Sequence, residues 1–325
     1  MIEKQPQRNI LLAGGCGFIG RQLAVALANR NWLVSIPGRR THRHRALLVH
    51  PNIRLIEANI IQPEDLQRVC RNQHAVINLV GILHERKKDD FRRIHVDFIK
   101  LLVATCNESG IKRLLHVSAL GANQASGSSL YLRSKGEGEN LLHTFGQRGL
   151  QVTSFQPSVV FGREDDFINR FNAILKWYIG YFPLACADSK LAPVFVGDLV
   201  EKIVHAVDDT ASFGKRYSVC GPEVFTLQQI LELIIGTMGY SSRILPLGKG
   251  LSRVQATVLQ NLPGKLFTMD NYRSLQTDSV CEQGNHCKTS LRHYLKGLSA
   301  MFATKSNYDQ FRRDYPIVGG SKDTR

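Results

Sequence analysis

The chain has 325 residues, of which 43% are hydrophobic, so it can bury the core of one large domain and a smaller lobe. Its formal net charge of +15 favours anionic partners, but its basic residues form no nucleic-acid-binding motif, so no nucleic acid is expected. No apolar run reaches the roughly 18 residues that a membrane-spanning helix needs, and we expect no signal peptide. The seven cysteines contain no CxxC pair, which predicts reduced thiols and a cytoplasmic protein.

Apolar runs of strand length alternate with helical patterns along the first part of the chain. The predicted strands are residues 9–13, 33–36, 53–57, 75–80, 113–118, 151–156, 193–196 and 217–220. Helices are predicted to begin near Gly17, Arg45, Pro63, Arg92 and Leu132, and a further helix, which Asp198 is placed to cap, runs to Val207. This alternation predicts βαβ units, and therefore an α/β fold with a Rossmann-type doubly wound parallel sheet.

The pattern changes after Gly221-Pro222, where helices and loops predominate. We therefore assign residues 1–220 to a dinucleotide-binding domain, from which residues 163–192 leave to help form a substrate pocket. Residues 221–325 are assigned to a smaller, mostly helical C-terminal substrate lobe. The last residues, 319–325, are expected to be a frayed tail.

A glycine-rich turn directly follows the first predicted strand. Its residues, which we predict to bind the cofactor, are Gly14, Gly15, Gly17, Phe18, Ile19 and Gly20. A strand, a glycine turn and a helix bind a dinucleotide pyrophosphate, because the turn admits the phosphates and the helix N-terminus offers free N–H groups. Gly17 is expected to let the backbone approach the phosphate, and Gly20 to let helix and strand pack closely.

The end of the second strand indicates which cofactor is bound. NAD-specific sites carry an acidic residue there for the ribose 2′-hydroxyl, whereas this chain has Arg39 and Arg40. Because the arginine fork matches phosphate geometry, we expect NADP(H) to be preferred, with NAD(H) as the alternative. The ends of the next two strands are expected to line the adenosine, through Asn59, Ile60, Leu79, Val80 and Gly81.

Three residues form a candidate catalytic set. Ser118 ends a predicted strand, and Tyr131 and Lys135 are one helical turn apart, on one face of the following helix. A neighbouring ammonium is expected to lower the pKa of the tyrosine, which then transfers a proton beside a nicotinamide. Ser118 would hold a substrate carbonyl, and Lys135 would also anchor the cofactor ribose.

Together these motifs resemble the extended short-chain dehydrogenase/reductase family over most of residues 8–235. The glycine turn, Ser118, Tyr131, Lys135, residues 157–162 and residues 196–198 follow the family's order. The resemblance implies that Pro157, Ser158 and Val159 also bind the cofactor. Residues 76–83, 118–122, 161–167, 221–226, 262–264 and 268–271 are similar to the atypical branch typified by the NADPH-binding accessory subunit of respiratory complex I, in which NADPH is structural.

The chain departs from the family pattern at three positions. Family members usually carry Thr at Ala13, many have Asn at His95, where it helps to organise a proton relay, and many have Arg at Gln156. The intact Ser–Tyr–Lys set therefore allows catalysis without establishing it.

For three further segments, a functional interpretation stands against a structural one. Residues 174–184 are unusually aromatic and either recognise an apolar, quinone-like substrate, contact a membrane, or pack in the core. Residues 291–302 place their apolar side chains on one helical face, which is typical of an interfacial helix or of a helix docked on a core. Cys281, His286 and Cys287 lie close together but provide too few ligands for zinc, so no metal is expected.

Two functions therefore remain open. One is an NADP(H)-binding accessory or assembly factor for a respiratory or quinone-related membrane complex, located peripherally at the inner face of a membrane. The alternative is an active NADP-dependent oxidoreductase or epimerase/dehydratase that uses Ser118, Tyr131 and Lys135.

Overall fold

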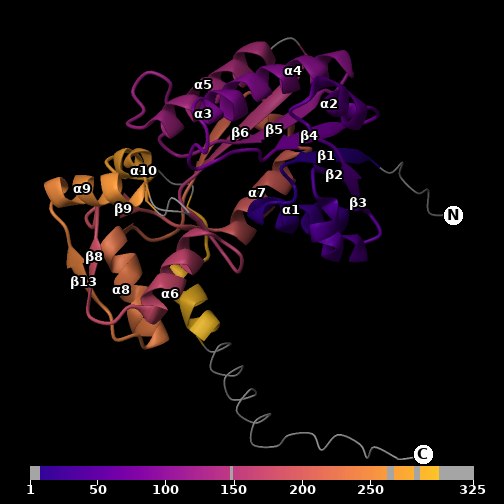
Figure 1. Cartoon of the computed structure of the whole chain (residues 1–325). Helices are drawn as coiled ribbons and strands as arrows, with labels where there is room; N and C mark the ends of the chain where they lie inside the picture. The colour runs from indigo at the N-terminus through magenta and orange to yellow at the C-terminus, as the bar shows by residue number, and fades with distance from the viewer. Residues whose placement is uncertain (1–7, 147–148, 262–266, 282–285, 300–325) are drawn as a thin grey trace, which may run out of the picture.

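The computed structural model describes residues 8–146, 149–261, 267–281 and 286–299. Its largest sheet is parallel, with seven strands in the order β11-β6-β5-β4-β1-β2-β3 (Figure 1). In chain order these strands are β1 (Asn9–Ala13), β2 (Leu33–Gly38), β3 (Ile53–Glu57), β4 (Ala75–Asn78), β5 (Arg113–Val117), β6 (Gln151–Pro157) and β11 (Arg216–Val219). The order reverses between β1 and β4, which is the switch point at which doubly wound sheets bind ligands.

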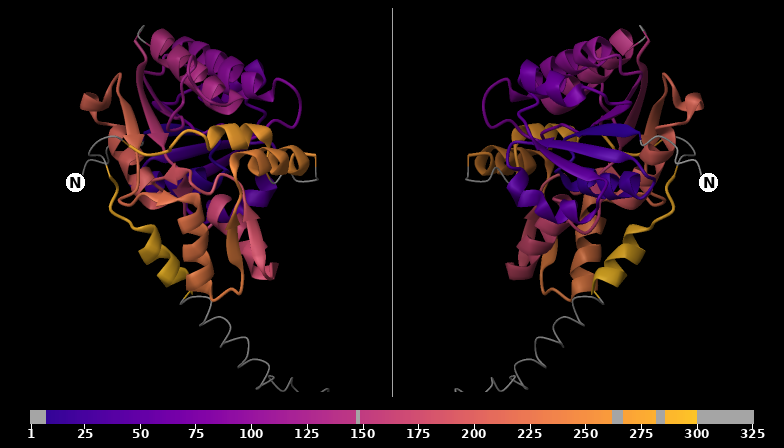
Figure 2. Two further views of the ribbon diagram at one scale, coloured as in Figure 1. Left: turned by 90° about the vertical axis from the view of Figure 1, so that its left-hand side faces the viewer. Right: turned by 90° about the vertical axis from the view of Figure 1, so that its right-hand side faces the viewer.

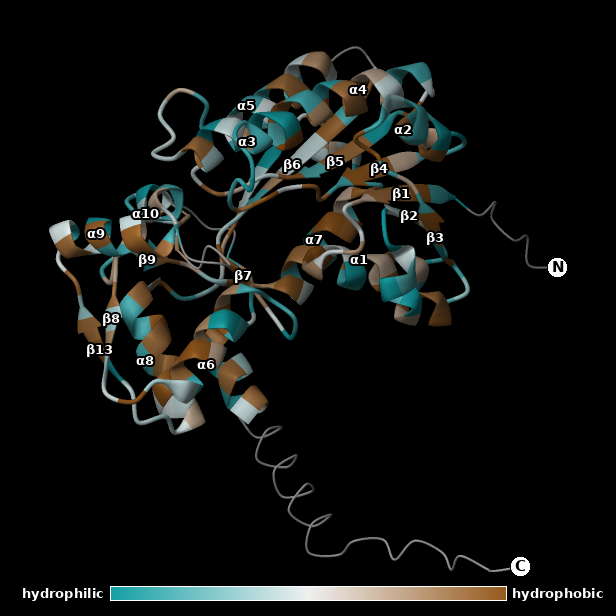
Figure 3. Ribbon diagram, viewed as in Figure 1, coloured by the Kyte–Doolittle hydropathy of each residue, from teal (hydrophilic) through white to brown (hydrophobic). Residues whose placement is uncertain are grey.

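Helices cover both faces of this sheet (Figure 1). One face is covered by α2 (Pro63–Cys70), α4 (Phe98–Glu108) and α5 (Leu130–Gly146), and the other by α1 (Phe18–Ala28) and α7 (Val196–Ala206). Successive side chains of a strand point to opposite faces, so Ile10 and Leu12 join the core beside α1 while Leu11 and Ala13 join the core beside α4. Figure 3 shows the resulting apolar strands in brown. This arrangement confirms the predicted fold class.

A second lobe lies beside the carboxyl ends of the strands (Figures 1 and 2). It contains α6 (Phe167–Trp177), β8 (Tyr181–Leu184), β9 (Lys190–Leu191), β12 (Phe225–Thr226), α8 (Leu227–Met238), β13 (Arg243–Pro246), α9 (Lys249–Leu259), α10 (Met269–Ser274) and a helix over residues 291–299. The lobe is mostly helical, as predicted, and its short strands pair β8 with β13 and β9 with β12. β7 (Val160–Phe161) and β10 (Val194–Phe195) pair where the chain passes between the lobes.

Local structure corrects three of the predicted helices. The helix predicted near Arg45 is a 3₁₀ segment, η1 (Thr41–Val49), and another 3₁₀ turn, η3 (Thr210–Ser212), precedes β11. The helix predicted near Arg92 is compound: α3 (Asp90–Arg92) passes into the π-turn η2 (Arg93–Asp97) before α4. Asp198 does not cap α7, because the helix already begins at Val196; its carboxylate instead accepts hydrogen bonds from the Thr289 backbone and hydroxyl.

The expectation that all cysteines are reduced is wrong for Cys220 and Cys281, which form a disulfide with a Cα–Cα distance of 6.0 Å. The two residues are 61 positions apart in the chain, so their spacing gave no signal. Cys16, Cys70, Cys106, Cys186 and Cys287 are free. The disulfide also removes Cys281 from the candidate cluster with His286 and Cys287.

The helix over residues 291–299 is docked on the core of the second lobe. Leu291 and Leu295 are buried there, with Tyr294 and Leu298 packed beside them. Its described part is therefore not an interfacial helix, and residues 300–302 and 319–325 lie outside the described residues. Among the described residues, no helix combines the length and the hydropathy needed to cross a bilayer.

Candidate functional site

The glycine turn joins β1 to α1 at the switch point of the sheet. Gly14 has a φ of +82°, and the N–H of Gly17 donates to the Gly14 carbonyl at 3.0 Å, which closes the turn. A Cβ on Gly20 would lie 2.5 Å from the Gly15 Cα, so only glycine lets α1 pack against the turn. A Cβ on Gly17 would meet only the Gly14 carbonyl, at 3.3 Å. The turn therefore leaves space next to Gly17, beside the N-terminus of α1, which fits a pyrophosphate.

The strand ends on either side of β1 adjoin this turn. A Cβ on Gly14 would lie 3.0 Å from the carbonyl carbon of Leu79 and from the Val80 nitrogen, directly after β4. On the other side, a Cβ on Gly38 at the end of β2 would lie 3.2 Å from the Cys16 sulfur. The structure therefore brings the glycine turn, Leu79, Val80 and the start of the Arg39–Arg40 segment together.

Arg39 and Arg40 follow β2 and are exposed. Within the described part of the chain, neither forms an ion pair with an acidic side chain. At the next strand end, the N–H of Asn59 donates to Asp65 at 2.7 Å, and Ile60 packs against the core beside α2. Both residues are partly exposed. The arginine pair thus places unneutralised positive charge beside the glycine turn.

Ser118, Tyr131 and Lys135 lie where β5 and α5 meet. Lys135 is buried, and its Nζ donates to the Val117 carbonyl at 2.8 Å. Ser118 is buried as well, and in the described residues its Oγ has no hydrogen-bond partner. Gly81 connects this set to the cofactor side, since a Cβ there would lie 3.7 Å from the Lys135 Nζ. A buried hydroxyl without a partner is costly, so Ser118 fits a residue that receives a ligand.

The expected lowering of the Tyr131 pKa is not found. Burial, with a smaller contribution from the Asp270 carboxylate, raises the pKa of Tyr131 to about 12. Burial also lowers the pKa of Lys135 to about 8, against the opposing influence of Glu139. The Lys135 ammonium is directed at the Val117 carbonyl, so the tyrosine remains a neutral proton donor.

His95 has a role that its position in the sequence did not reveal. The N–H of Ile82 donates to its Nε2 at 3.1 Å, so the proton is on Nδ1, which donates to the Ser134 hydroxyl at 2.8 Å. Ser134 in turn donates to the Tyr131 carbonyl. Burial, with the Lys135 charge, lowers the pKa of His95 to about 2. The neutral imidazole thus links α5 to the segment after β4 through two hydrogen bonds. His95 itself lies in the π-turn η2.

Residues 157–159 lie at the end of β6. The Leu120 N–H donates to the Pro157 carbonyl, which places residue 157 beside the Ser118 segment. The Ser158 hydroxyl donates to the Ser279 carbonyl at 2.8 Å, and Val159 packs against the core of the second lobe. The structure therefore puts these three residues between the catalytic set and the second lobe, with the Ser158 side chain engaged by that lobe.

The second lobe also holds the N-terminus of α5. Asp270 of α10 accepts hydrogen bonds from the N–H groups of Leu130 and Tyr131, at 2.8 and 3.1 Å. Asp270 thus caps a helix whose Tyr131 lies 139 residues earlier in the chain. Its negative charge lies beside the positive N-terminal end of the helix dipole. The sequence offered no signal for this contact, because a cap from another lobe leaves no local pattern.

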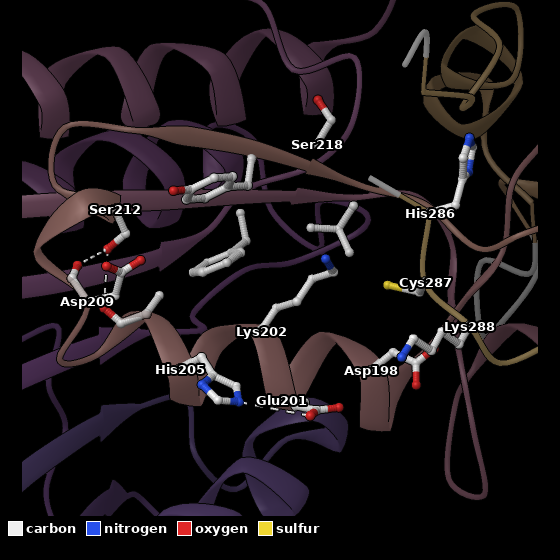
Figure 4. Close-up of a pocket in the computed structure, with 14 residues that line it drawn as sticks. Asp198, Glu201, Lys202, His205, Asp209, Ser212, Ser218, His286, Cys287 and Lys288 are labelled. Carbon is white, nitrogen blue, oxygen red and sulfur yellow. Dashed lines mark hydrogen bonds and ion pairs between the residues drawn. The ribbon is translucent and has the colours of Figure 1, made fainter. Parts of the chain in front are cut away.

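A separate groove of about 440 Å³ lies between α7 and the β6–β11 edge of the sheet (Figure 4). Phe155, Lys202, Tyr217 and Cys287 are among its lining residues. None of the predicted site residues lines it, so the groove is distinct from the glycine turn and the Ser–Tyr–Lys set.

The sheet order, the glycine turn and the Ser–Tyr–Lys arrangement define a Rossmann-type dinucleotide-binding protein of the short-chain dehydrogenase/reductase type. Residues 10–220 match the NAD dependent epimerase/dehydratase family, and the chain belongs to this family. Membership of an NAD-dependent family supports nicotinamide dinucleotide binding.

Similar proteins include respiratory subunits. The chain is 28% identical to subunit 9 of the NADH dehydrogenase [ubiquinone] 1 alpha subcomplex of Arabidopsis thaliana, across 95% of this chain and 79% of that protein. It is 30% identical to the Mus musculus subunit 9, across 69% of this chain and only 59% of that protein. A ceramide reductase of Caulobacter vibrioides is 26% identical across 60% of this chain and 59% of its own length. The UDP-glucose 4-epimerase of Thermotoga maritima shares the fold, with a TM-score of 0.72, 17% identity and coverage of 92% of this chain and 99% of that one.

Proposed function

We propose that the chain binds NADP(H) in preference to NAD(H) and holds it as a structural element, in an accessory or assembly role at a respiratory or quinone-related membrane complex. The likeness to respiratory subunits supports this role. The observation that carries the cofactor preference is the exposed Arg39–Arg40 pair beside the glycine turn. Residues 33–56 contain no Asp or Glu that could receive a ribose hydroxyl at the end of β2.

The residues of the site would hold the cofactor in a defined way. The glycine turn and the N-terminus of α1 would bind the pyrophosphate, and Arg39 and Arg40 would bind the 2′-phosphate. When bound, the nicotinamide supplies or accepts a hydride. The high pKa of Tyr131 and the low pKa of His95 favour a site that keeps the phenol protonated, because neither group titrates near neutral pH. Lys135, with a pKa of about 8, donates to the Val117 carbonyl.

Cofactor titration of Arg39→Ala tests the preference. We expect the wild-type chain to bind NADPH more tightly than NADH, and Arg39→Ala to weaken NADPH binding by about tenfold while leaving NADH unchanged, because a charge-assisted contact contributes about 1.5 kcal/mol. Arg54→Ala removes an exposed arginine of β3 and serves as the control of equal charge. Equal affinity of the wild-type chain for both cofactors would contradict the proposed preference.

A second function is favoured by one observation. The buried, unpartnered Ser118 hydroxyl lies beside Lys135 and is placed to bind a substrate carbonyl. In this alternative the chain is an oxidoreductase or epimerase/dehydratase in which Tyr131 donates the proton, and the likeness to a ceramide reductase supports an apolar substrate. Loss of turnover in Tyr131→Phe would distinguish this alternative from the structural role.

A further inference from the structure

Large apolar side chains are exposed along the outer side of the second lobe. At the turn between α6 and β8, Trp177 is 81% exposed and Ile179 is 88% exposed. The exposed residues continue through β8, β13 and α9, and we call the set the outer lobe surface: Trp177, Ile179, Tyr181, Leu245, Leu251, Val254 and Val258. Figure 3 shows β13 and part of α9 in brown on this side of the lobe. Side chains of this size and exposure on one lobe indicate an interaction surface.

Helix α9 is oriented with its apolar side outward. Leu251, Val254 and Val258 recur at a spacing that places them on one helical face, and all three are exposed. The buried positions of the same helix are the small residues Ser252 and Ala256. A helix that only covered a core would show the reverse pattern.

The strands beside α9 continue this surface. In the parallel β8–β13 pair, Tyr181 is beside Arg243 and Pro183 is beside Leu245, and residues two apart in a strand share a face. Gln255 of α9 donates to the Pro183 carbonyl at 2.9 Å, which ties the helix to the same strand. The α6–β8 turn, the strand pair and α9 thus adjoin one another through β8.

The charges on these segments have a single sign. Residues 167–184 and 240–261 contain no Asp or Glu, whereas they contain Arg170, Lys176, Arg243, Lys249 and Arg253. Arg170 pairs with Asp166, and the other four are exposed. A surface with exposed Trp and Tyr, an outward apolar helix face and only basic charges combines the features that bind an anionic lipid surface.

We propose that the outer lobe surface docks peripherally on a bilayer that contains anionic lipids, with the Trp177–Ile179 turn entering the headgroup region. A protein partner is less favoured, because Lys is depleted in protein–protein interfaces whereas Lys176 and Lys249 flank the apolar residues here. The inference deepens the membrane association of the proposed function. It does not depend on NADP(H) binding, so the two can fail separately.

Vesicle binding by the full chain tests the inference. We expect co-flotation with vesicles of phosphatidylcholine containing phosphatidylglycerol, and little with phosphatidylcholine alone. The chain has two tryptophans, and Trp32 is only 4% exposed, so a blue shift of the fluorescence on adding anionic vesicles would report on Trp177. Absence of binding to the anionic vesicles would overturn the proposal.

Paired variants assign the binding to this surface. Ile179→Ser should weaken vesicle binding by about tenfold or more, since it removes an apolar side chain that would enter the lipid. Val49→Ser, at a residue 87% exposed on η1, should leave binding unchanged. Likewise Lys176→Glu should weaken binding, whereas Lys100→Glu on α4 should have little effect. NADPH affinity should stay at the wild-type level in all four variants.

Two results would contradict the proposal. Vesicle binding that is equally affected in the surface variants and their controls would place the lipid contact elsewhere. A self-associating chain that Ile179→Ser makes monomeric in analytical ultracentrifugation, without any vesicle binding, would show that the surface contacts protein.

Discussion

Lys135 is a buried cation whose only hydrogen bond in the described structure is to the Val117 carbonyl. Burial lowers its pKa to about 8, whereas the unfolded chain keeps the ordinary value near 10.5. Between pH 8 and 10.5 the unfolded chain binds more protons at this residue than the folded protein does. The free energy of unfolding therefore rises with pH over this range, and the stability that neutral Lys135 contributes at high pH is lost as the pH falls through 8. At neutral pH the ammonium therefore opposes folding.

Lys135→Met should reveal this cost. We expect the variant to be more stable than the wild-type chain at pH 7, because it replaces a buried charge with an apolar side chain of similar length. The difference should shrink by about 2 kcal/mol between pH 8 and pH 9.5, at about 1.4 kcal/mol per pH unit. Urea unfolding of both proteins at pH 7, 8 and 9.5 measures it. A difference that does not change with pH would show that Lys135 does not titrate in this range.

At the scale of elements, the position of α5 depends on the second lobe. Asp270 accepts two backbone N–H groups at the helix N-terminus, and Ser274 and Thr277 bind the hydroxyls of Ser129 and Ser128 just before it. The helix that carries Tyr131 and Lys135 is therefore positioned by residues far along the chain. Loosening this contact should disturb the site without touching its own side chains.

Asp270→Ala and Asp270→Asn separate the two effects of this cap. Asp270→Ala should lower the stability of the chain by about 1 kcal/mol, because it leaves two helix N–H groups without their acceptor. Asn keeps an acceptor oxygen, so Asp270→Asn should lose less stability while still removing the negative charge that raises the Tyr131 pKa. Thermal unfolding of both variants measures the difference. Equal losses in the two variants would mean that the charge, rather than the hydrogen bonds, stabilises α5.

The strands of the main sheet were predictable because buried parallel strands are short apolar runs between helical patterns. β1 and β3 have their predicted bounds, and α2 begins at the predicted Pro63. The features that were missed depend on residues far apart in the chain. The segment around Arg45 has no apolar helical face to bury, Asp198 bonds Thr289, and Cys220 bonds Cys281; local sequence contains no information about these partners.

At the scale of the whole molecule, the site lies where strand ends from one lobe meet a second lobe. Topology explains why the predicted glycine turn, Leu79, Val80, Gly81 and Lys135 adjoin one another, because parallel strands bring their carboxyl ends to one edge. The contacts of Ser158 and Asp270 with the second lobe could not be predicted, since they depend on how that lobe docks. A cofactor bound at this site would therefore stabilise the contact between the two lobes as well as the glycine turn that binds its phosphates.

Two variants assayed together test whether the cofactor is held and not turned over. Gly17→Val should fold, because a Cβ there meets only one backbone oxygen, but its side chain would occupy the space for the pyrophosphate. NADPH at about 100 times its Kd should stabilise the wild-type chain by about 2.7 kcal/mol and leave Gly17→Val unchanged.

The decisive measurement is complementation of a strain that lacks the chain, with thermal unfolding of the same proteins in the presence of NADPH. We expect Tyr131→Phe to melt like the wild-type chain and to complement, because the hydroxyl matters only for proton transfer. Gly17→Val should melt earlier in the presence of NADPH and fail to complement. A Tyr131→Phe protein that melts like the wild-type chain and yet fails to complement would rule out a purely structural role for the cofactor, and would show that the chain acts as an enzyme.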